Sequence, residues 1–176
     1  MCLAWSVYSK RYPDFTTVTC LDWKPVLVEN AYKDIIIDSL RFLVSADRVS
    51  VYGFVIMANH FHLLWQMMGD HALEEVQRDF LKYTAQRILQ RLRNAGSPLL
   101  NELVVNLEDR KHQVWKRNSL SIPLWTPKVL IQKLNYMHQN PVRAGICAFP
   151  EEYKYSSAGF YELGKRDWDF LVHIGG

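Results

Sequence analysis

The order of two hydrophobic patterns, alternation and helical spacing, most constrains the fold of this chain. Short β-branched or alternating apolar segments are typical of strands, and apolar residues three to four apart are typical of helices. Along the chain these patterns predict a strand (Phe15–Leu21), a helix (Asn30 to Leu43), two strands (Val49–Met57 and His60–Gln66), a long helix (Leu73–Leu92) and a later helix (Pro127 to Gln139). The order predicts an α+β fold, a ferredoxin-like antiparallel β-sheet with helices packed on one of its faces. The segment from Leu99 to Asn118 has too little periodicity to assign an element.

Residues at the helix ends refine these predictions. Asn30 is expected to cap the first helix, and Thr126 to cap the last one with Pro127 as its first residue. The last helix is expected to stop near Pro141, because the residue before a proline disfavours helical geometry. Gly145 then helps the chain to turn.

The size and composition of the chain predict one globular domain spanning residues 1–176. Hydrophobic residues make up 49% and charged residues 22%, an ordinary balance for a folded domain. The net charge of +3 is compatible with a nucleic-acid partner but too small to imply one. The three cysteines, Cys2, Cys20 and Cys147, form no CxxC pattern, so neither a disulfide framework nor a zinc site is expected. We find no signal-peptide pattern and no membrane-spanning apolar run, and therefore expect a soluble, cytoplasmic protein.

The sequence His60-Phe61-His62 is the first candidate for chemistry. Alternate side chains of a strand share a face, so both imidazoles should project together while Phe61 points to the other side. At ~3.3 Å per residue, two ring nitrogens can converge on one divalent ion. Two histidines in this pattern also occur as ordinary strand residues, and that alternative stays open.

Tyr136 and Asn140 are the second candidate, four residues apart on one face of the last predicted helix. A phenol held near a metal-bound phosphate can act as a nucleophile, and a carboxamide one turn later can add an oxygen ligand. The alternative is a core aromatic at Tyr136 and a residue that satisfies helix-terminal carbonyls at Asn140.

Four basic residues form a candidate DNA-binding surface: Arg78, Lys82 and Arg87 on the long helix, and Arg143 beyond the last one. A solvated helix face explains the first three equally well. Tyr83, beside Lys82, is interpreted as a helix-face aromatic with a DNA contact at most.

Three further residues receive structural interpretations. His138 is given a minor structural or DNA-contact role, because it lies two residues beyond Tyr136 and points elsewhere on the helix. Asn59 is interpreted as shaping the strand entry rather than binding metal, and Trp65 as a core residue.

Three segments resemble one protein family. Val51–Trp65 (VYGFVIMANHFHLLW) resembles the histidine segment of single-tyrosine HUH transposases, and Leu134–Ile146 (LNYMHQNPVRAGI) resembles the tyrosine helix of REP-associated tyrosine transposases. Lys154–Ala158 (KYSSA) resembles a short motif that follows it. The resemblance extends over most of the chain, from about Phe15 to Phe160. The spacing of NHFH and YMHQNPVRAG is its most specific feature.

The resemblance implies a metal-dependent enzyme that nicks and rejoins single-stranded DNA at a hairpin or repeat. It implies that His60, His62 and Asn140 hold Mg²⁺ or Mn²⁺, and that Tyr136 attacks the phosphate to form a 5′-phosphotyrosine. Among such relatives both monomers and homodimers with shared active sites occur, so a homodimer stays open for this chain.

The sequence departs from the family at two places. Ala58 stands where these relatives commonly have proline, which affects local stiffness. The stretch Trp115–Leu124 (WKRNSLSIPL) lacks the aromatic-acidic-histidine run of many relatives. The second departure bears on DNA contacts and full transposition more than on cleavage.

Two other functions remain open from the sequence. One is a hairpin-DNA-binding module of the same fold that has lost catalysis. The other is a metal-dependent hydrolase in which the histidine pair activates water and Tyr136 is structural. The intact set of His60, His62, Tyr136 and Asn140 favours retained nucleophilic chemistry.

Overall fold

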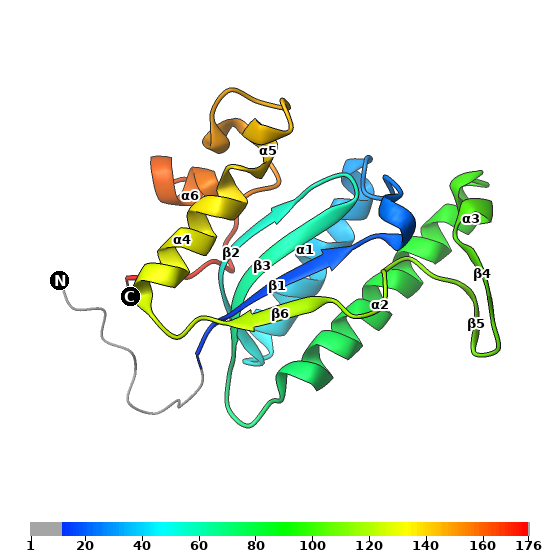
Figure 1. Cartoon of the computed structure of the whole chain (residues 1–176), viewed down its shortest axis with the longest axis horizontal. Coiled ribbons are helices and arrows are strands. Elements are labelled where there is room, and N and C mark those ends of the chain that lie inside the picture. The colour runs from blue at the N-terminus through cyan, green and yellow to red at the C-terminus, as the bar shows by residue number, and fades with distance from the viewer. Residues whose placement is uncertain (1–11, 176) are drawn as a thin grey trace.

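A four-stranded antiparallel sheet lies at the centre of the computed structural model, which describes residues 12–175 (Figure 1). The strand order is β2-β3-β1-β6, and each neighbouring pair is antiparallel. The strands are β1 (Asp14–Thr19), β2 (Val49–Ile56), β3 (His60–Met67) and β6 (Leu120–Pro123). The main helices are α1 (Asn30–Ser45), α2 (Leu73–Asn94) and α4 (Pro127–His138).

The connectivity β1-α1-β2-β3-α2-β6 is that of a ferredoxin-like fold, so the predicted fold class is confirmed. The segment without clear periodicity contains α3 (Leu99–Glu102) and a small hairpin of β4 (Val104–Leu107) and β5 (Arg110–His112). The edge strand β6 was not predicted, because four residues are too few to establish an alternating pattern.

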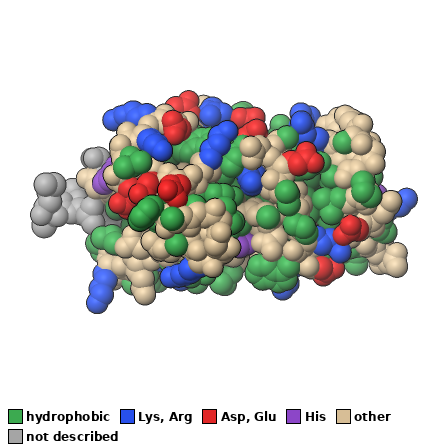
Figure 2. Space-filling view, turned by 90° about the horizontal axis from the view of Figure 1, so that it is seen from above, with side chains coloured by type: hydrophobic (Ala, Val, Ile, Leu, Met, Phe, Trp, Pro, Cys, Tyr) green, Lys and Arg blue, Asp and Glu red, His purple; other side chains and the backbone are tan. Residues whose placement is uncertain are grey.

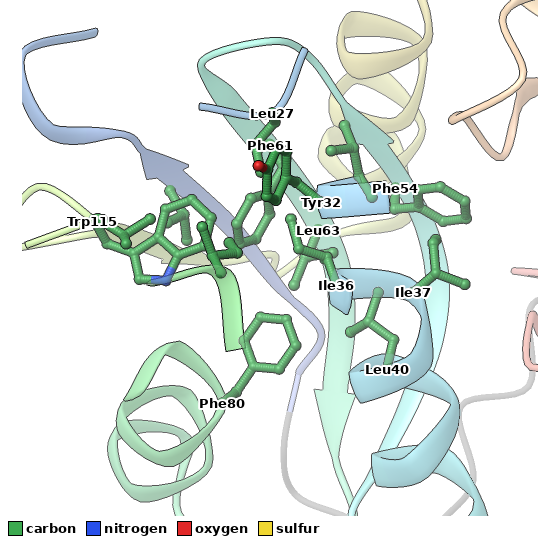
Figure 3. Packing of buried hydrophobic residues seen from close by; sticks show 14 of the residues in the cluster. Leu27, Tyr32, Ile36, Ile37, Leu40, Phe54, Phe61, Leu63, Phe80 and Trp115 are labelled. Carbon is green, nitrogen blue, oxygen red and sulfur yellow. The ribbon is translucent and has the colours of Figure 1, made fainter. Parts of the chain in front are cut away.

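One face of the sheet packs against α1 and α2 (Figure 3). Phe61 projects to this side, as predicted, and its ring makes edge contacts with Phe80 of α2 and with Trp115. Ile36 and Leu40 of α1 belong to the same cluster. This cluster is the larger of the two hydrophobic cores and holds both helices to the sheet.

The other face of the sheet packs against α4, so the expectation of helices on one face is wrong. Leu130, Leu134 and Met137 of α4 form a second hydrophobic cluster with Phe15 and Leu64 of the sheet. The helix α4 is apolar on one side only. Because α1 and α2 already cover one face of the sheet, the apolar side of α4 can be buried only against the other face.

Residue 53 of β2 is a glycine, and α4 packs against the sheet at this position. A Cβ atom at Gly53 would lie 2.8 Å from Leu134 Cδ1 and closer still to Met137 Cε. The missing side chain therefore lets α4 approach the sheet.

The helix ends agree only in part with the expectations. Thr126 caps α4 as predicted, and its hydroxyl accepts a hydrogen bond from the backbone N–H of Val129 at 3.3 Å. Asn30 is the first residue of α1 and not its cap, which is Glu29. The prediction that the last helix stops near Pro141 is confirmed, because α4 ends at His138. A separate short helix, α5 (Asn140–Arg143), follows and accommodates the proline in its first turn.

The C-terminal segment covers the free edge of β2. It contains two short helices, η2 (Pro150–Glu152) and α6 (Ala158–Leu163). One more short helix, η1 (Leu21–Trp23), lies near the other end of the chain, directly after β1. The backbone N–H of Ile56 donates to the carbonyl of Tyr155 at 2.9 Å. The hydroxyls of Tyr153 and Tyr161 each donate to a carbonyl of β2 at 2.7 Å. These bonds satisfy backbone groups that an open sheet edge would leave exposed.

None of the helices described between residues 12 and 175 has both the length and the apolar character needed to cross a membrane.

Candidate metal and tyrosine site

The two imidazoles of β3 lie together on the α4 face of the sheet. His60 and His62 pair with Thr19 and Thr17 of β1, and their ring centroids are 5.1 Å apart at an interplanar angle of 73°. Because the central strand is held on both sides by β1 and β2, the spacing of the two rings is fixed by the sheet. The prediction that both rings share a face is confirmed.

Asn59 orients the first imidazole. The Nδ1 atom of His60 lies 2.7 Å from Oδ1 of Asn59, and a carboxamide oxygen only accepts hydrogen bonds. Nδ1 of His60 therefore donates, and in the neutral ring Nε2 carries the free lone pair. Metal-binding histidines are commonly held by such a second hydrogen bond. From the sequence, Asn59 was expected only to shape the entry into the strand. Its position directly before the histidine pair was the available signal that it orients an imidazole.

His62 is buried and held by contacts with Thr17 and Phe15. Its Nδ1 atom lies 2.9 Å from the hydroxyl of Thr17, and its ring stacks on Phe15 with centroids 5.2 Å apart. Burial is the main cause that lowers the pKa of His62 to about 3, with smaller contributions from His60 and Lys133. Burial also lowers the pKa of His60. Both rings are thus neutral at neutral pH, the form in which imidazole binds metal.

Tyr136 places its ring beside the second imidazole. Its centroid is 5.7 Å from that of His62 and 6.2 Å from that of Phe15, in edge-to-face contacts. The side chain is 40% exposed, so the ring is not buried in the core as the structural alternative required. A strand and a helix 74 residues apart in sequence thereby bring imidazole and phenol together.

Asn140 lies one turn beyond Tyr136 and has a clear structural role. Its carboxamide nitrogen donates to the carbonyls of Tyr136 and Met137 at 3.3 and 3.4 Å. Pro141 has no N–H to donate to the carbonyl of Met137, so the side chain of Asn140 replaces that bond. Between residues 12 and 175 no hydrogen bond joins Asn140 to either imidazole. Its carboxamide oxygen is the atom suited to a metal.

Two cations flank the phenol ring. Arg143 places its guanidinium carbon 5.2 Å from the ring centroid of Tyr136, and Lys133 places Nζ 5.7 Å from it. Lys133 also lies 5.1 Å from the ring centroid of Phe15. Arg143 was predicted as a DNA contact, whereas Lys133 was missed. Its position three residues before Tyr136, on the same helix face, was the only sequence signal.

The other predicted DNA contacts are not brought to this site. Arg78, Lys82 and Arg87 are exposed on α2, which covers the opposite face of the sheet. Arg78 forms an ion pair with Asp79 at 3.0 Å. Figure 2 shows basic and acidic side chains interspersed over the visible face rather than one basic field.

Three remaining interpretations can be compared with the structure. His138 is buried, and its Nε2 atom lies 2.7 Å from the hydroxyl of Ser157, so a DNA contact is wrong and a structural role fits. Trp65 is fully buried, as predicted, and donates to the hydroxyl of Thr16 at 2.9 Å. Tyr83 is an exposed side chain of α2, on the far side from the histidines.

Residues 12–175 hold no metal-ligand cluster of the usual kind. Within the described part of the chain, no group of three or more histidine, cysteine or acidic side chains is placed to hold an ion. A metal at the histidine pair would therefore take its further ligands from a carboxamide, from water or from a bound phosphate.

The fold is shared with transposases of known structure. A REP-associated tyrosine transposase bound to a REP hairpin is 16% identical, with a TM-score of 0.65 over 100% of this chain and 91% of that chain. A protein from Deinococcus radiodurans R1 described as a transposase is 14% identical, with a TM-score of 0.52 over 77% of this chain and 95% of that chain. The sequence matches no protein-family model and no curated protein.

At these identities the likeness establishes the fold. The resemblance to REP-associated tyrosine transposases is confirmed at that level, over the full length of the chain. The residues that act and the reaction they perform do not follow from a shared fold and need their own argument.

Proposed function

We propose that this chain is a metal-dependent endonuclease and strand transferase that acts on single-stranded DNA through a 5′-phosphotyrosine intermediate. One observation carries the proposal: the partly exposed ring of Tyr136 lies 5.7 Å from the ring of His62, beside a second oriented imidazole. A nucleophile next to a pair of metal-ligating nitrogens is the arrangement that phosphoryl transfer requires.

The residues present fit Mg²⁺ or Mn²⁺. Both imidazoles are neutral, and His60 keeps Nε2 available because its Nδ1 atom is used by Asn59. Nε2 of His60, Nε2 of His62 and the carboxamide oxygen of Asn140 would hold the ion. When bound, it would polarise the phosphoryl oxygens and neutralise charge that builds up on them.

Tyr136 supplies the nucleophile in this mechanism. Its phenolic oxygen loses its proton to solvent water and forms a bond to phosphorus, and the bond from phosphorus to the 3′-oxygen breaks. The departing 3′-oxygen takes a proton and becomes a free hydroxyl, while the 5′-phosphate stays on the protein. The reverse reaction with another 3′-hydroxyl rejoins DNA without an energy cofactor. Lys133 and Arg143, at 5.7 and 5.2 Å from the phenol ring centroid, neutralise the phosphate as it approaches.

Single-stranded DNA that forms a hairpin or repeat is the proposed partner. The support is that one structure of the same fold contains a transposase bound to a REP hairpin. A homodimer remains a prediction from the sequence.

The proposal is tested by trapping the covalent intermediate. We expect labelled hairpin DNA, incubated with the protein and Mn²⁺, to form an adduct that survives denaturing electrophoresis. Tyr136→Phe should abolish it, because phenylalanine lacks the attacking oxygen. Tyr83→Phe is the matched control, since Tyr83 is also exposed but lies on α2. Cleavage that persists in Tyr136→Phe without an adduct would indicate a hydrolase. Tight hairpin binding without cleavage or adduct in the unaltered protein would indicate a binding module.

A further inference from the structure

We infer that a groove between the start of α2 and the junction of β6 with α4 binds an unpaired nucleobase that carries an exocyclic amino group. The groove has a volume of about 390 Å³, which falls within the range of small-ligand sites. Its lining residues include Tyr12, Asp14, Met67, Leu73, Glu74 and Trp125. The inference rests on the proposed function only in taking single-stranded DNA as the ligand.

The groove is separate from the histidine pair. His60 begins β3 and Met67 ends it, so the groove and the first imidazole lie about 23 Å apart along the strand, at ~3.3 Å per residue. No part of the proposed nucleophile site lines the groove.

Two exposed aromatic rings form one wall. The backbone N–H of Leu124 donates to the carbonyl of Pro13 at 2.8 Å, which sets the neighbouring residues Tyr12 and Trp125 side by side. Their ring centroids are 4.7 Å apart, and the side chains are 42% and 64% exposed. Aromatic surface that the backbone holds in place, yet that stays open to solvent, is suited to stacking on an unpaired base.

A carboxyl pair lies beside the rings. Asp14 begins β1, Glu74 lies in the first turn of α2, and between residues 12 and 175 neither side chain forms an ion pair. Ionised carboxylates only accept hydrogen bonds. An exocyclic amino group of cytosine, adenine or guanine offers two N–H donors, enough for both carboxylates, whereas unpaired thymine offers only its single ring N3–H. The carboxyl pair therefore favours an amino-bearing base over thymine.

Cations that suit the flanking phosphates follow along α2. Arg78 and Lys82 are four and eight residues beyond Glu74, on the same side of the helix, which places them about 6 and 12 Å further along its axis. Both are exposed. Arg78 and Lys82, remote from Tyr136, thus acquire a role next to the groove.

The helix α4 connects the groove with the nucleophile. Trp125 directly precedes the cap of α4, and Tyr136 is ten residues beyond that cap, about 15 Å along the helix. A base held in the groove would therefore fix which phosphate of the same strand reaches Tyr136, and so set the position of cleavage.

The test measures binding and cleavage separately on the full chain. Fluorescence anisotropy with labelled (dC)₈ and (dT)₈, without divalent metal, should give tighter binding of (dC)₈. Trp125→Ala should weaken binding of both probes roughly tenfold, and Trp125→Phe should retain most of it. Asp14→Ala should remove the preference for (dC)₈. Phe42→Ala is the control, because Phe42 is a similarly exposed aromatic on α1.

The outcomes separate the two proposals. Unchanged binding in Trp125→Ala, or a preference for (dC)₈ that survives in Asp14→Ala, would contradict base binding in the groove. This holds even if the unaltered protein forms the tyrosine adduct. If binding depends on Trp125 but the protein forms no adduct, base binding in the groove is supported and the proposed nuclease activity is contradicted.

Discussion

The carboxamide oxygen of Asn59 accepts a hydrogen bond from Nδ1 of His60 at 2.7 Å, and this contact decides which nitrogen of that ring is available. The acceptor comes from the residue directly before the strand, so the bond is set by the chain's entry into β3. A neutral imidazole fixed in this way presents Nε2 as a ligand before any ion arrives.

Asn59→Ala should weaken Mn²⁺ binding roughly 10- to 100-fold, because the imidazole of His60 loses the partner that holds its orientation and proton. Isothermal titration of Mn²⁺ measures the change. Asn59→Asp retains an acceptor oxygen and should keep most of the affinity. Equal affinity in Asn59→Ala and the unaltered protein would contradict a role for this contact in metal binding.

Lys133→Ala should lower the rate of adduct formation on the order of 10- to 100-fold, because a cation near the approaching phosphate is removed. Single-turnover measurements with labelled hairpin DNA give the rate, and Lys133→Arg should restore most of it. Lys128→Ala is the matched control, as it removes the same charge from an exposed position of α4. The idea fails if both alanine variants slow the reaction equally.

Gly53→Ala should destabilise the protein by about 1–3 kcal/mol, because its Cβ atom would overlap Leu134 and Met137 of α4. Urea denaturation measures the loss. Combining it with Met137→Ala should cost less than the sum of the single variants, since the second change makes room for the first. Strict additivity would show that α4 does not press on β2 at this position.

Asp14→Asn should stabilise the protein at pH 7.5 but not at pH 4. Burial, followed by the carboxylate of Glu74, raises the pKa of Asp14 to about 6 in the folded protein. A raised pKa means that the stability from the protonated carboxyl is fully present below about pH 4 and lost as pH rises through about 6. The gain should be on the order of 1 kcal/mol, because water still screens a half-buried carboxylate.

Urea denaturation at the two pH values measures this difference. Tyr12, His71 and Glu74 are the other titratable groups that line the groove around Asp14. Glu74→Gln should shift the profile in the same direction by a smaller amount, since Glu74 is the second cause of the raised pKa. A stability difference that stays constant across the pH range would contradict the assignment.

Much of the fold could be predicted because its signals are local. The strands β2 and β3 and the helix α2 each agree with their predicted bounds to within about two residues, since alternation and helical spacing are properties of neighbouring residues. The shared face of His60 and His62 follows from the two-residue period of a strand alone.

The short or exposed elements could not be predicted. The hairpin of β4 and β5 and the edge strand β6 are three or four residues long, and β6 forms because its backbone pairs with β1, more than 100 residues earlier. Such pairing depends on distant residues and leaves almost no pattern within the segment itself.

The sequence by itself determined the order of the main elements, the ferredoxin-like fold and the common direction of the two imidazoles. Only the tertiary structure decided that α2 and α4 cover opposite faces of the sheet, so that Tyr136 meets His62 while Arg78, Lys82 and Arg87 do not. The reason is that a helix pattern shows which side must be buried but not against what; that choice depends on which apolar surface the rest of the chain leaves open.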